Sequence, residues 1–148
     1  MNDNFYNPPT PLEHRFNRFF GVLVRLGLAL PHNYLLVVRG RKTGNEYSMP
    51  VDLLVFDGRR FLVAPRGETQ WVRNVRAAGE VTLRKGVHVE SAAAVPVGDE
   101  EKPKLLKAYL DRFSRTVSRY FPLPPGAPLE AFLPLAPRYP VFELKPIK

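Results

Sequence analysis

The sequence of 148 residues contains no cysteine and only three histidines. Without cysteine the chain forms no disulfide, offers no thiolate nucleophile and is compatible with a reducing compartment. His14, His32 and His88 lie far apart in the sequence and match no zinc-binding spacing, so each is interpreted as a surface or packed residue. The sequence therefore predicts neither a metal site nor cysteine chemistry.

Long apolar runs are absent as well. The apolar stretch at residues 19–30 is interrupted by Arg25 and is too short to cross a bilayer. Residues 1–11 are polar and contain proline, which is unlike a secretory signal. We therefore expect a cytoplasmic protein, with contact to a membrane surface left open.

Acidic residues are few, because 14 Asp and Glu stand against 22 Lys and Arg, giving a formal net charge of +8. Such a balance favours polyanionic partners: nucleic acid, anionic lipid, or a phosphorylated or carboxylated small molecule. No RNA-binding aromatic signature or helix-turn-helix is visible, so nucleic acid is not predicted as a partner. The length and the 45% share of hydrophobic residues suit one domain over residues 1–148, with residues 1–10 as a flexible arm.

The stretch GRKTG, residues 40–44, carries the most distinctive chemistry. It separates two apolar runs, as a hairpin turn does. Its two glycines allow positive φ and the close approach of a ligand. Arg41 can fork onto a phosphate, Lys42 adds a point charge and Thr43 adds a hydroxyl. The stretch predicts either a phosphate site or an ordinary basic surface turn.

Residues 10–30 have the pattern of an amphipathic helix. Thr10 can cap its start, Pro11 suits the first turn and Glu13 completes a capping box. Two interpretations stay open: a helix packed on the domain with a solvated basic face, or a basic helix that touches a membrane. The expected apolar stripe consists of Leu12, Phe16, Phe19, Leu23, Leu26 and Leu30.

Turn signals divide the rest of the chain into short strands. Asp57-Gly58 is a two-residue hairpin signal, and Lys85-Gly86 marks another turn. Pro50 is expected to interrupt its strand: it cannot donate to a strand ladder, so a bulge or a sheet edge is expected there. Strands are predicted at residues 34–39, 46–56, 61–65, 81–83, 87–97 and 141–144.

Two helices are expected among these strands. The first follows Thr69 and ends at Gly79, and its inner face is expected to hold Trp71, Val75 and Ala78. The second covers residues 99–121 and should bury a stripe of Leu106, Tyr109, Phe113, Val117 and Tyr120.

Tight hairpins make the predicted sheet antiparallel. The pattern predicts a mainly β, α+β fold, in which five or six strands form a small barrel or a strongly curled sheet with helices packed outside. The proline-rich residues 122–140 are predicted to be an ordered loop, a lid or a stiff crossing.

The GRKTG turn is followed by Pro50, by the Asp57-Gly58 hairpin and by Trp71-x-x-Asn74 on the short helix. This order and spacing resemble the deazaflavin-dependent nitroreductase family. The resemblance implies an antiparallel split β-barrel of the FMN-binding kind. It also implies coenzyme F420, a deazaflavin that carries a phosphodiester and an oligoglutamate tail, with FMN as the less favoured cofactor.

The resemblance covers residues 34–85 and, more weakly, residues 139–146. It implies a phosphate-binding turn, a proline beside the cofactor, a small residue at a strand end and a helix that closes over the cofactor. Basic residues such as Arg73 would add matching charge, and apolar residues would wall the ring. The predicted cofactor-binding residues are Arg41, Lys42, Thr43, Gly44, Pro50, Ala64, Pro65, Arg66, Trp71, Asn74 and Arg76.

The sequence departs from the family pattern at four places. The loop before the short helix is shorter, so Arg66 is expected to replace the basic residue near it. Tyr47 stands where family members often carry an arginine, and Val51 and Asp52 stand where a tyrosine is common. The proline-rich residues 121–140 replace an aromatic-rich segment. The identity of the substrate therefore stays open.

The resemblance implies an oxidoreductase that moves a hydride from reduced deazaflavin to a quinone, an activated alkene or a nitroaromatic. The cofactor carries the hydride, so the protein has to bind and orient the two reactants, and no catalytic dyad is expected. Three tyrosines are candidates for protonating the product: Tyr47, Tyr120 and Tyr139. For each tyrosine taken singly, an ordinary core or rim aromatic is the favoured interpretation.

Two further questions stay open at this point. The same fold could serve as a non-enzymatic module that holds a fatty acid or another hydrophobic anion. The chain could also act as a homodimer.

Overall fold

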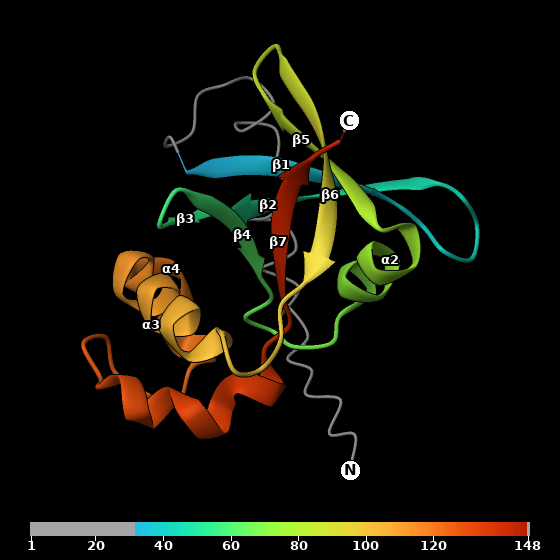
Figure 1. Cartoon of the computed structure of the whole chain (residues 1–148). Coiled ribbons are helices and arrows are strands. Elements are labelled where there is room, and N and C mark those ends of the chain that lie inside the picture. Colours follow the sequence, from blue (N-terminus) through green and yellow to red (C-terminus); the bar gives the residue numbers. More distant parts are fainter. Residues whose placement is uncertain (1–31, 148) are drawn as a thin grey trace.

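The computed structural model describes residues 32–147 (Figure 1). The predicted helix at residues 10–30 and the arm at residues 1–10 lie outside the described residues. The strands are β1 (Asn33–Arg39), β2 (Glu46–Asp52), β3 (Leu54–Phe56), β4 (Arg59–Val63), β5 (Glu80–Lys85), β6 (His88–Pro96) and β7 (Val141–Pro146). The helices are α2 (Gln70–Ala78), α3 (Lys102–Arg112), α4 (Ser114–Val117), and the 3-10 helices η1 (Ser118–Tyr120) and η2 (Leu129–Arg138).

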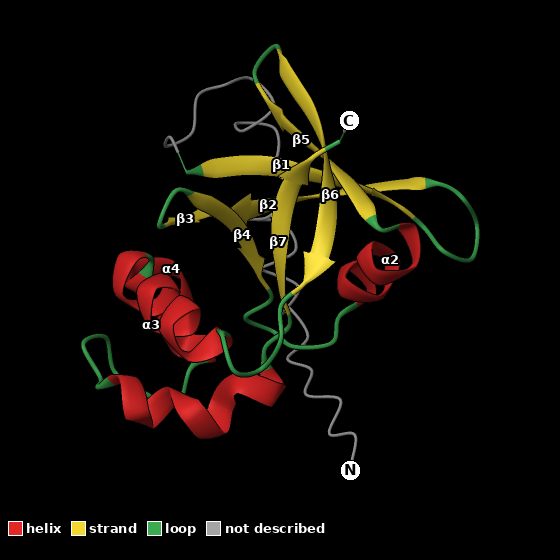
Figure 2. Cartoon of the chain, viewed as in Figure 1, coloured by secondary structure: helices red, strands yellow, loops and turns green. Residues whose placement is uncertain are grey.

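Within the described residues the strands form one seven-stranded sheet in the order β2-β1-β5-β6-β7-β4-β3. Every neighbouring pair is antiparallel. Figure 2 shows the sheet strongly curled, with α2 beside one part of it and α3 and α4 beside another. This is the split β-barrel with flanking helices that the sequence predicts.

The predicted strand at residues 46–56 is two strands, which is why the sheet has seven members. The break lies at Leu53, whose backbone N–H donates to the carbonyl oxygen of His32 at 2.8 Å. Pro50 lies inside β2, opposite Leu35, so the predicted interruption at Pro50 is wrong. The alternative expectation of a sheet edge is confirmed, because β2 is the terminal strand and an edge tolerates a missing donor.

The hairpin signal at Asp57-Gly58 is confirmed. Both residues have positive φ, 55° and 74°, as the two central residues of a type I′ turn require. The turn joins β3 to β4, which pair in antiparallel register.

One buried cluster fills the inside of the curled sheet, where α2 packs against it. Val72 and Val75 of α2 are fully buried, and Trp71 packs at the margin of this cluster. Ala78 was expected on the same face but is exposed. The helix ends immediately afterwards at Gly79, whose φ of 74° gives a left-handed cap.

A second, aromatic-rich cluster lies between the outer side of β3, β4 and β7 and the helices α3, α4 and η2. The predicted inner stripe from Leu106 to Tyr120 is buried, as expected. The single helix predicted over residues 99–121 is wrong, because α3 begins at Lys102 and the helix is interrupted at Phe113, which has φ of −113° and ψ of 26°. The interruption turns the chain so that α4 and η1 keep the stripe against the core.

The proline-rich segment is ordered, as one of the predicted alternatives requires. Its residues form η2, which contains Pro134 and Pro137 and buries Phe132 completely. The ammonium of Lys102 at the start of α3 donates to the carbonyl oxygen of Ala136 at 3.1 Å, which ties η2 to α3. Proline lacks an N–H, so such a segment relies on side-chain burial and on contacts of this kind.

Candidate functional site

The GRKTG turn joins β1 to β2 and is closed by its own backbone. The N–H of Gly40 donates to the carbonyl oxygen of Asn45 at 2.7 Å, and the N–H of Gly44 donates to that of Gly40 at 3.0 Å. Gly44 has φ of 77°, which L side chains rarely adopt. A Cβ at Gly40 would lie 2.5 Å from Cε2 of Tyr47, so a side chain there has no room.

Arg41 connects this turn to α2 through Asn74, which lies 33 residues later in the sequence. Its backbone N–H and its Nη1 donate to Oδ1 of Asn74 at 3.2 and 2.7 Å. Its Nη2 donates to Oε1 of Gln70 at 2.9 Å. Asn74 is buried. Its hydrogen bonds with Arg41 bring the Trp71-x-x-Asn74 pattern into direct contact with the turn.

A groove of about 310 Å³ lies between the turn, β2 and α2. One wall is polar and comes from the turn, whereas Met49 and Trp71 supply an apolar side. The first two residues of α2 border it, so the positive end of the helix dipole faces the groove. The lining residues are Gly40, Arg41, Lys42, Thr43, Tyr47, Ser48, Met49, Gln70, Trp71 and Asn74.

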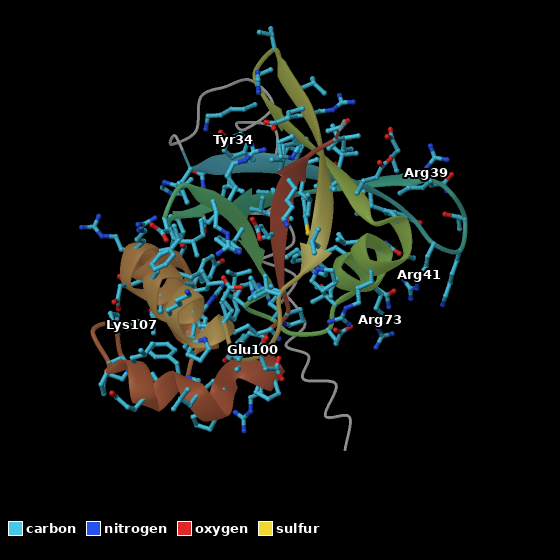
Figure 3. The ribbon with its side chains drawn as sticks, in the orientation of Figure 1. Tyr34, Arg39, Arg41, Arg73, Glu100 and Lys107 are labelled. Atoms are coloured by element: carbon cyan, nitrogen blue, oxygen red, sulfur yellow. The ribbon has the colours of Figure 1, made fainter. Side chains whose placement is uncertain are left out.

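The charged side chains that line the groove are both basic, Arg41 and Lys42. Lys42 is exposed, and Lys42, Arg39 and Arg73 form no ion pair with any residue in the range 32–147. Figure 3 shows Arg39, Arg41 and Arg73 on the side of the molecule that carries α2, whereas Lys107 lies on the opposite side. An anion at the groove would therefore meet Arg41 and Lys42, and Lys42 has no ion-pair partner within residues 32–147.

Five predicted cofactor residues line the groove: Arg41, Lys42, Thr43, Trp71 and Asn74. Gly44 shapes the turn without lining the groove. Pro50 lies opposite Leu35, on the other face of β1 and β2 from Met49 and Leu36, and so points away from the groove.

The remaining predicted residues lie elsewhere. Ala64 is fully buried in the core under α2, and Pro65 follows it outside the groove. Arg66 donates to the hydroxyl of Tyr120, with its guanidinium 4.5 Å from the ring centroid. Arg76 is paired with Glu68 and lies over the ring of Phe142.

Only Tyr47 among the three candidate tyrosines lines the groove. Its hydroxyl lies 3.4 Å from Oγ1 of Thr43. Tyr139 is buried and donates to the carbonyl oxygen of Tyr120 at 2.6 Å, and its burial raises its pKa. Tyr120 accepts from Arg66 and Arg119. The structure therefore favours Tyr47 over the other two as a groove residue.

Sequence reasoning missed Gln70, Ser48 and Met49 as groove residues. Gln70 immediately follows the predicted helix start at Thr69. Its place at the groove becomes visible only from its hydrogen bond with Arg41 in the structure. Ser48 and Met49 precede Pro50 on the edge strand. Side chains alternate between the two faces of a strand, and this alternation could have indicated that Met49 faces the groove.

No group of three or more His, Cys, Asp or Glu residues within 32–147 is arranged to hold a metal ion. None of the helices in that part of the chain has the length and apolarity needed to cross a bilayer.

Comparison with known proteins identifies a family. A model of the F420H2-dependent quinone reductase family matches residues 13–119. No protein of curated function matches the sequence.

Solved structures share the fold at low sequence identity. A protein of unknown function from Agrobacterium tumefaciens is 17% identical with a TM-score of 0.59; the match covers 95% of this chain but only 59% of that protein. An F420-H2 dependent reductase, FDR-A, is 18% identical with a TM-score of 0.54, over 78% of this chain and 95% of the reductase. An FAD-binding protein from Mesorhizobium loti is 15% identical with a TM-score of 0.51, over 88% and 89% of the two chains.

The family match spans the turn, the groove and α2, and the solved structures share the curled antiparallel sheet. The chain belongs to the F420H2-dependent quinone reductase family.

Proposed function

We propose that this chain binds coenzyme F420 in the groove between the GRKTG turn and α2, and passes a hydride from the reduced coenzyme to a quinone. An activated alkene or a nitroaromatic is the alternative acceptor. The observation that carries the proposal is the convergence of the basic turn, the start of α2 and Trp71 on one groove. The family match supports the coenzyme and the class of acceptor.

The donors around the groove suit a phosphate. Lys42 is exposed and unpaired within the described residues, and the hydroxyl of Thr43 stands beside it. Two guanidinium N–H groups of Arg41 donate to Gln70 and Asn74. A guanidinium has five N–H donors, so three remain to bind an oxyanion. We propose that Arg41 both fixes the turn and contacts the phosphate, while Lys42 acts as a point charge.

The apolar side of the groove suits the ring of the coenzyme. Met49 and Trp71 offer a half-buried apolar surface, and Arg73 offers charge for a carboxylate tail. Pro50, Ala64, Pro65, Arg66 and Arg76 do not line the groove, so any part they take in cofactor binding would be indirect.

When bound, the reduced coenzyme supplies the hydride, and the chain has to bind and orient the reactants. Trp71 and Met49 would exclude water from one side of the ring. The hydroxyl of Tyr47, beside Thr43, is the groove group that we propose as the proton donor to the reduced product.

Titration of the purified protein with F420 and, separately, with FMN tests cofactor choice. We expect tight binding of F420 and weak binding of FMN, which lacks the oligoglutamate tail. Reduced F420 should then be oxidised when menadione is added. Tight binding without turnover on quinones, enones and nitroaromatics would instead favour the non-enzymatic binding module.

A homodimer stays a proposal, supported by a solved structure described as a domain-swapped dimer, with 18% identity and a TM-score of 0.57 over 92% of this chain and 100% of that one. Light scattering on the purified protein would test it. Cytoplasmic location and membrane contact through residues 10–30 also stay predictions.

A further inference from the structure

The turn between β5 and β6 exposes apolar side chains to solvent. Lys85 pairs with His88, so Gly86 and Val87 form a two-residue turn between the strands. The side chain of Val87 is fully exposed, and Val89, the second residue of β6, keeps an exposed fraction of 56%. Figure 1 shows that this hairpin projects from the curled sheet, with its turn beyond the ends of the other strands. The hairpin therefore carries an apolar point away from the body of the protein.

The geometry of the turn does not require a valine. Gly86 has φ of 60°, and Val87 is not among the described residues with positive φ, which is the pattern of a type II′ turn. The second central position of such a turn is commonly Asn, Asp or Ser. A valine that buries none of its side chain there adds nothing to the hydrophobic core. Its apolar surface is therefore available to a partner outside the chain.

The end of β7 adds a third apolar side chain beside this hairpin. Pro146 pairs with Ala92 of β6, and Ile147 follows it with an exposed fraction of 47%. Figure 1 shows the C-terminal end of β7 next to the hairpin. Isolated exposed apolar residues are normal on a protein surface, whereas a group of them on one projecting element indicates a contact surface. We call this group the apolar tip; it consists of Val87, Val89 and Ile147.

The charged side chains around the apolar tip are mostly basic. Residues 84–89 contain no acid. The next residue, Glu90, is held by the guanidinium of Arg60 through two hydrogen bonds of 2.9 and 2.5 Å, so its negative charge is compensated. This balance attracts an anionic surface. The basic residues beside the tip are Arg84, which pairs with Val89 across the hairpin, Lys85 at the turn, and the exposed Lys145 on β7.

The shape of the tip suits a lipid surface better than a folded protein. A stable protein interface buries about 800 Å² on each partner, and a projecting two-residue turn does not offer a flat area of that size. An apolar point with basic neighbours instead fits the headgroup region of an anionic bilayer, where apolar side chains reach the acyl boundary and cations meet lipid phosphates. We propose that the β5–β6 turn docks on an anionic lipid bilayer, with Val87 and Val89 inserted. This inference goes beyond the proposed function and does not depend on it.

The lack of cysteine makes the contact easy to locate. Val87→Cys gives the full chain a single thiol, which takes an environment-sensitive fluorophore. Vesicles of phosphatidylcholine with about one third phosphatidylglycerol are then added. The emission of the label should rise and shift to the blue as the label leaves water. The matched control is Leu133→Cys, at an exposed apolar position of η2, which lies at the opposite end of the molecule from the turn; its label should not respond.

Vesicle sedimentation measures the affinity of unlabelled protein for the same vesicles. The double variant Val87→Ser and Val89→Ser keeps every charge but loses the apolar side chains, so it should bind at least about tenfold more weakly than the wild type. Serine suits this turn, and thermal melting checks that the variant is folded. Leu133→Ser should bind as the wild type does. Binding of the wild type should weaken as the salt concentration rises and should be weaker still on pure phosphatidylcholine.

The inference is overturned if the label at Val87→Cys does not respond to the vesicles, or if the label at Leu133→Cys responds equally. It is also overturned if the double serine variant binds vesicles as tightly as the wild type, since the contact would then lie elsewhere, for example at residues 10–30. A wild type that ignores vesicles but self-associates, with the serine variant monomeric, would show that the apolar tip contacts a second copy instead. All of these measurements are made without F420, so they are independent of the proposed activity.

Discussion

Two groups of basic side chains in this molecule differ in what they face. On β4, Arg59 pairs with Glu143 and Glu101 at 2.7 Å each, and Arg60 pairs with Glu90. On the side that carries the groove, Lys42 and Arg73 form no ion pair among the described residues. The first group is satisfied by the folded chain itself, whereas the second keeps its charge available. This difference locates the ligand surface better than net charge does.

The two regions also differ in how they are held together. The side of the molecule formed by α3, α4 and η2 is stabilised by an aromatic-rich core. The turn–helix corner is held instead by polar contacts between Arg41, Gln70 and Asn74. We therefore expect variants of the first region to act on stability and variants of the second to act on ligand binding.

The largest effect on stability is expected at Phe132 in η2, which is fully buried. Phe132→Ala should lower the free energy of unfolding by about 3–5 kcal/mol, because it leaves a cavity in the aromatic core. Urea denaturation measures this. The neighbouring Leu133→Ala, at an exposed position, should stay within about 0.5 kcal/mol of the wild type. The dissociation constant for F420 should be unaltered in folded protein of both variants; a large change would break the separation of the two regions.

A smaller effect on stability is expected at the turn–helix corner. Arg41→Ala and Asn74→Ala should each lower the free energy of unfolding by about 1–3 kcal/mol, since each leaves a buried or half-buried polar group without its partner. The double variant should cost clearly less than the sum, with a coupling of about 0.5–3 kcal/mol. Additive effects in this double-mutant cycle would mean that the contact between the turn and α2 is not energetically important.

The smallest effect is expected from the paired group. Arg59 lowers the pKa of Glu143, mainly through a hydrogen bond. A lowered pKa in the folded state stabilises the protein above the ordinary value of 4.5, and this stabilisation is lost as the pH falls through the folded-state pKa. Arg59→Met should therefore be slightly less stable than the wild type at neutral pH, and the difference should shrink below pH 4.5. Unfolding midpoints measured at neutral and acid pH would contradict this if the gap stayed constant.

Local sequence patterns predicted the parts of the fold that depend on short-range chemistry. The Asp57-Gly58 hairpin and the left-handed end of α2 at Gly79 follow directly from residues that tolerate positive φ. The buried stripe of α3 follows from apolar spacing, but the interruption at Phe113 does not, because it depends on how the chain turns over the core.

The candidate site was predicted less completely, because its contacts join distant segments. The turn and Asn74 were each identified from sequence, but the bond between Arg41 and Asn74 spans 33 residues and is fixed by the packing of α2. The face on which Pro50 lies depends on strand register, which a single sequence does not define.

The central claim is that unpaired charge at the turn binds the coenzyme phosphate. The most direct test compares the dissociation constants for F420 of the wild type, Lys42→Ala and Lys104→Ala by calorimetry at low and high salt. Lys104 is an exposed lysine on α3 without an ion-pair partner among the described residues, so it matches the lost charge at a distant position.

A charge-assisted contact contributes about 1.5–3 kcal/mol, so the Lys42→Ala variant should bind F420 roughly 10- to 150-fold more weakly than the wild type. The affinity of the wild type for F420 should also fall as the salt concentration rises. Lys104→Ala should bind F420 as the wild type does. If folded Lys42→Ala kept the wild-type dissociation constant, or if both variants weakened binding equally, the turn would be an ordinary basic surface and the coenzyme would lie elsewhere.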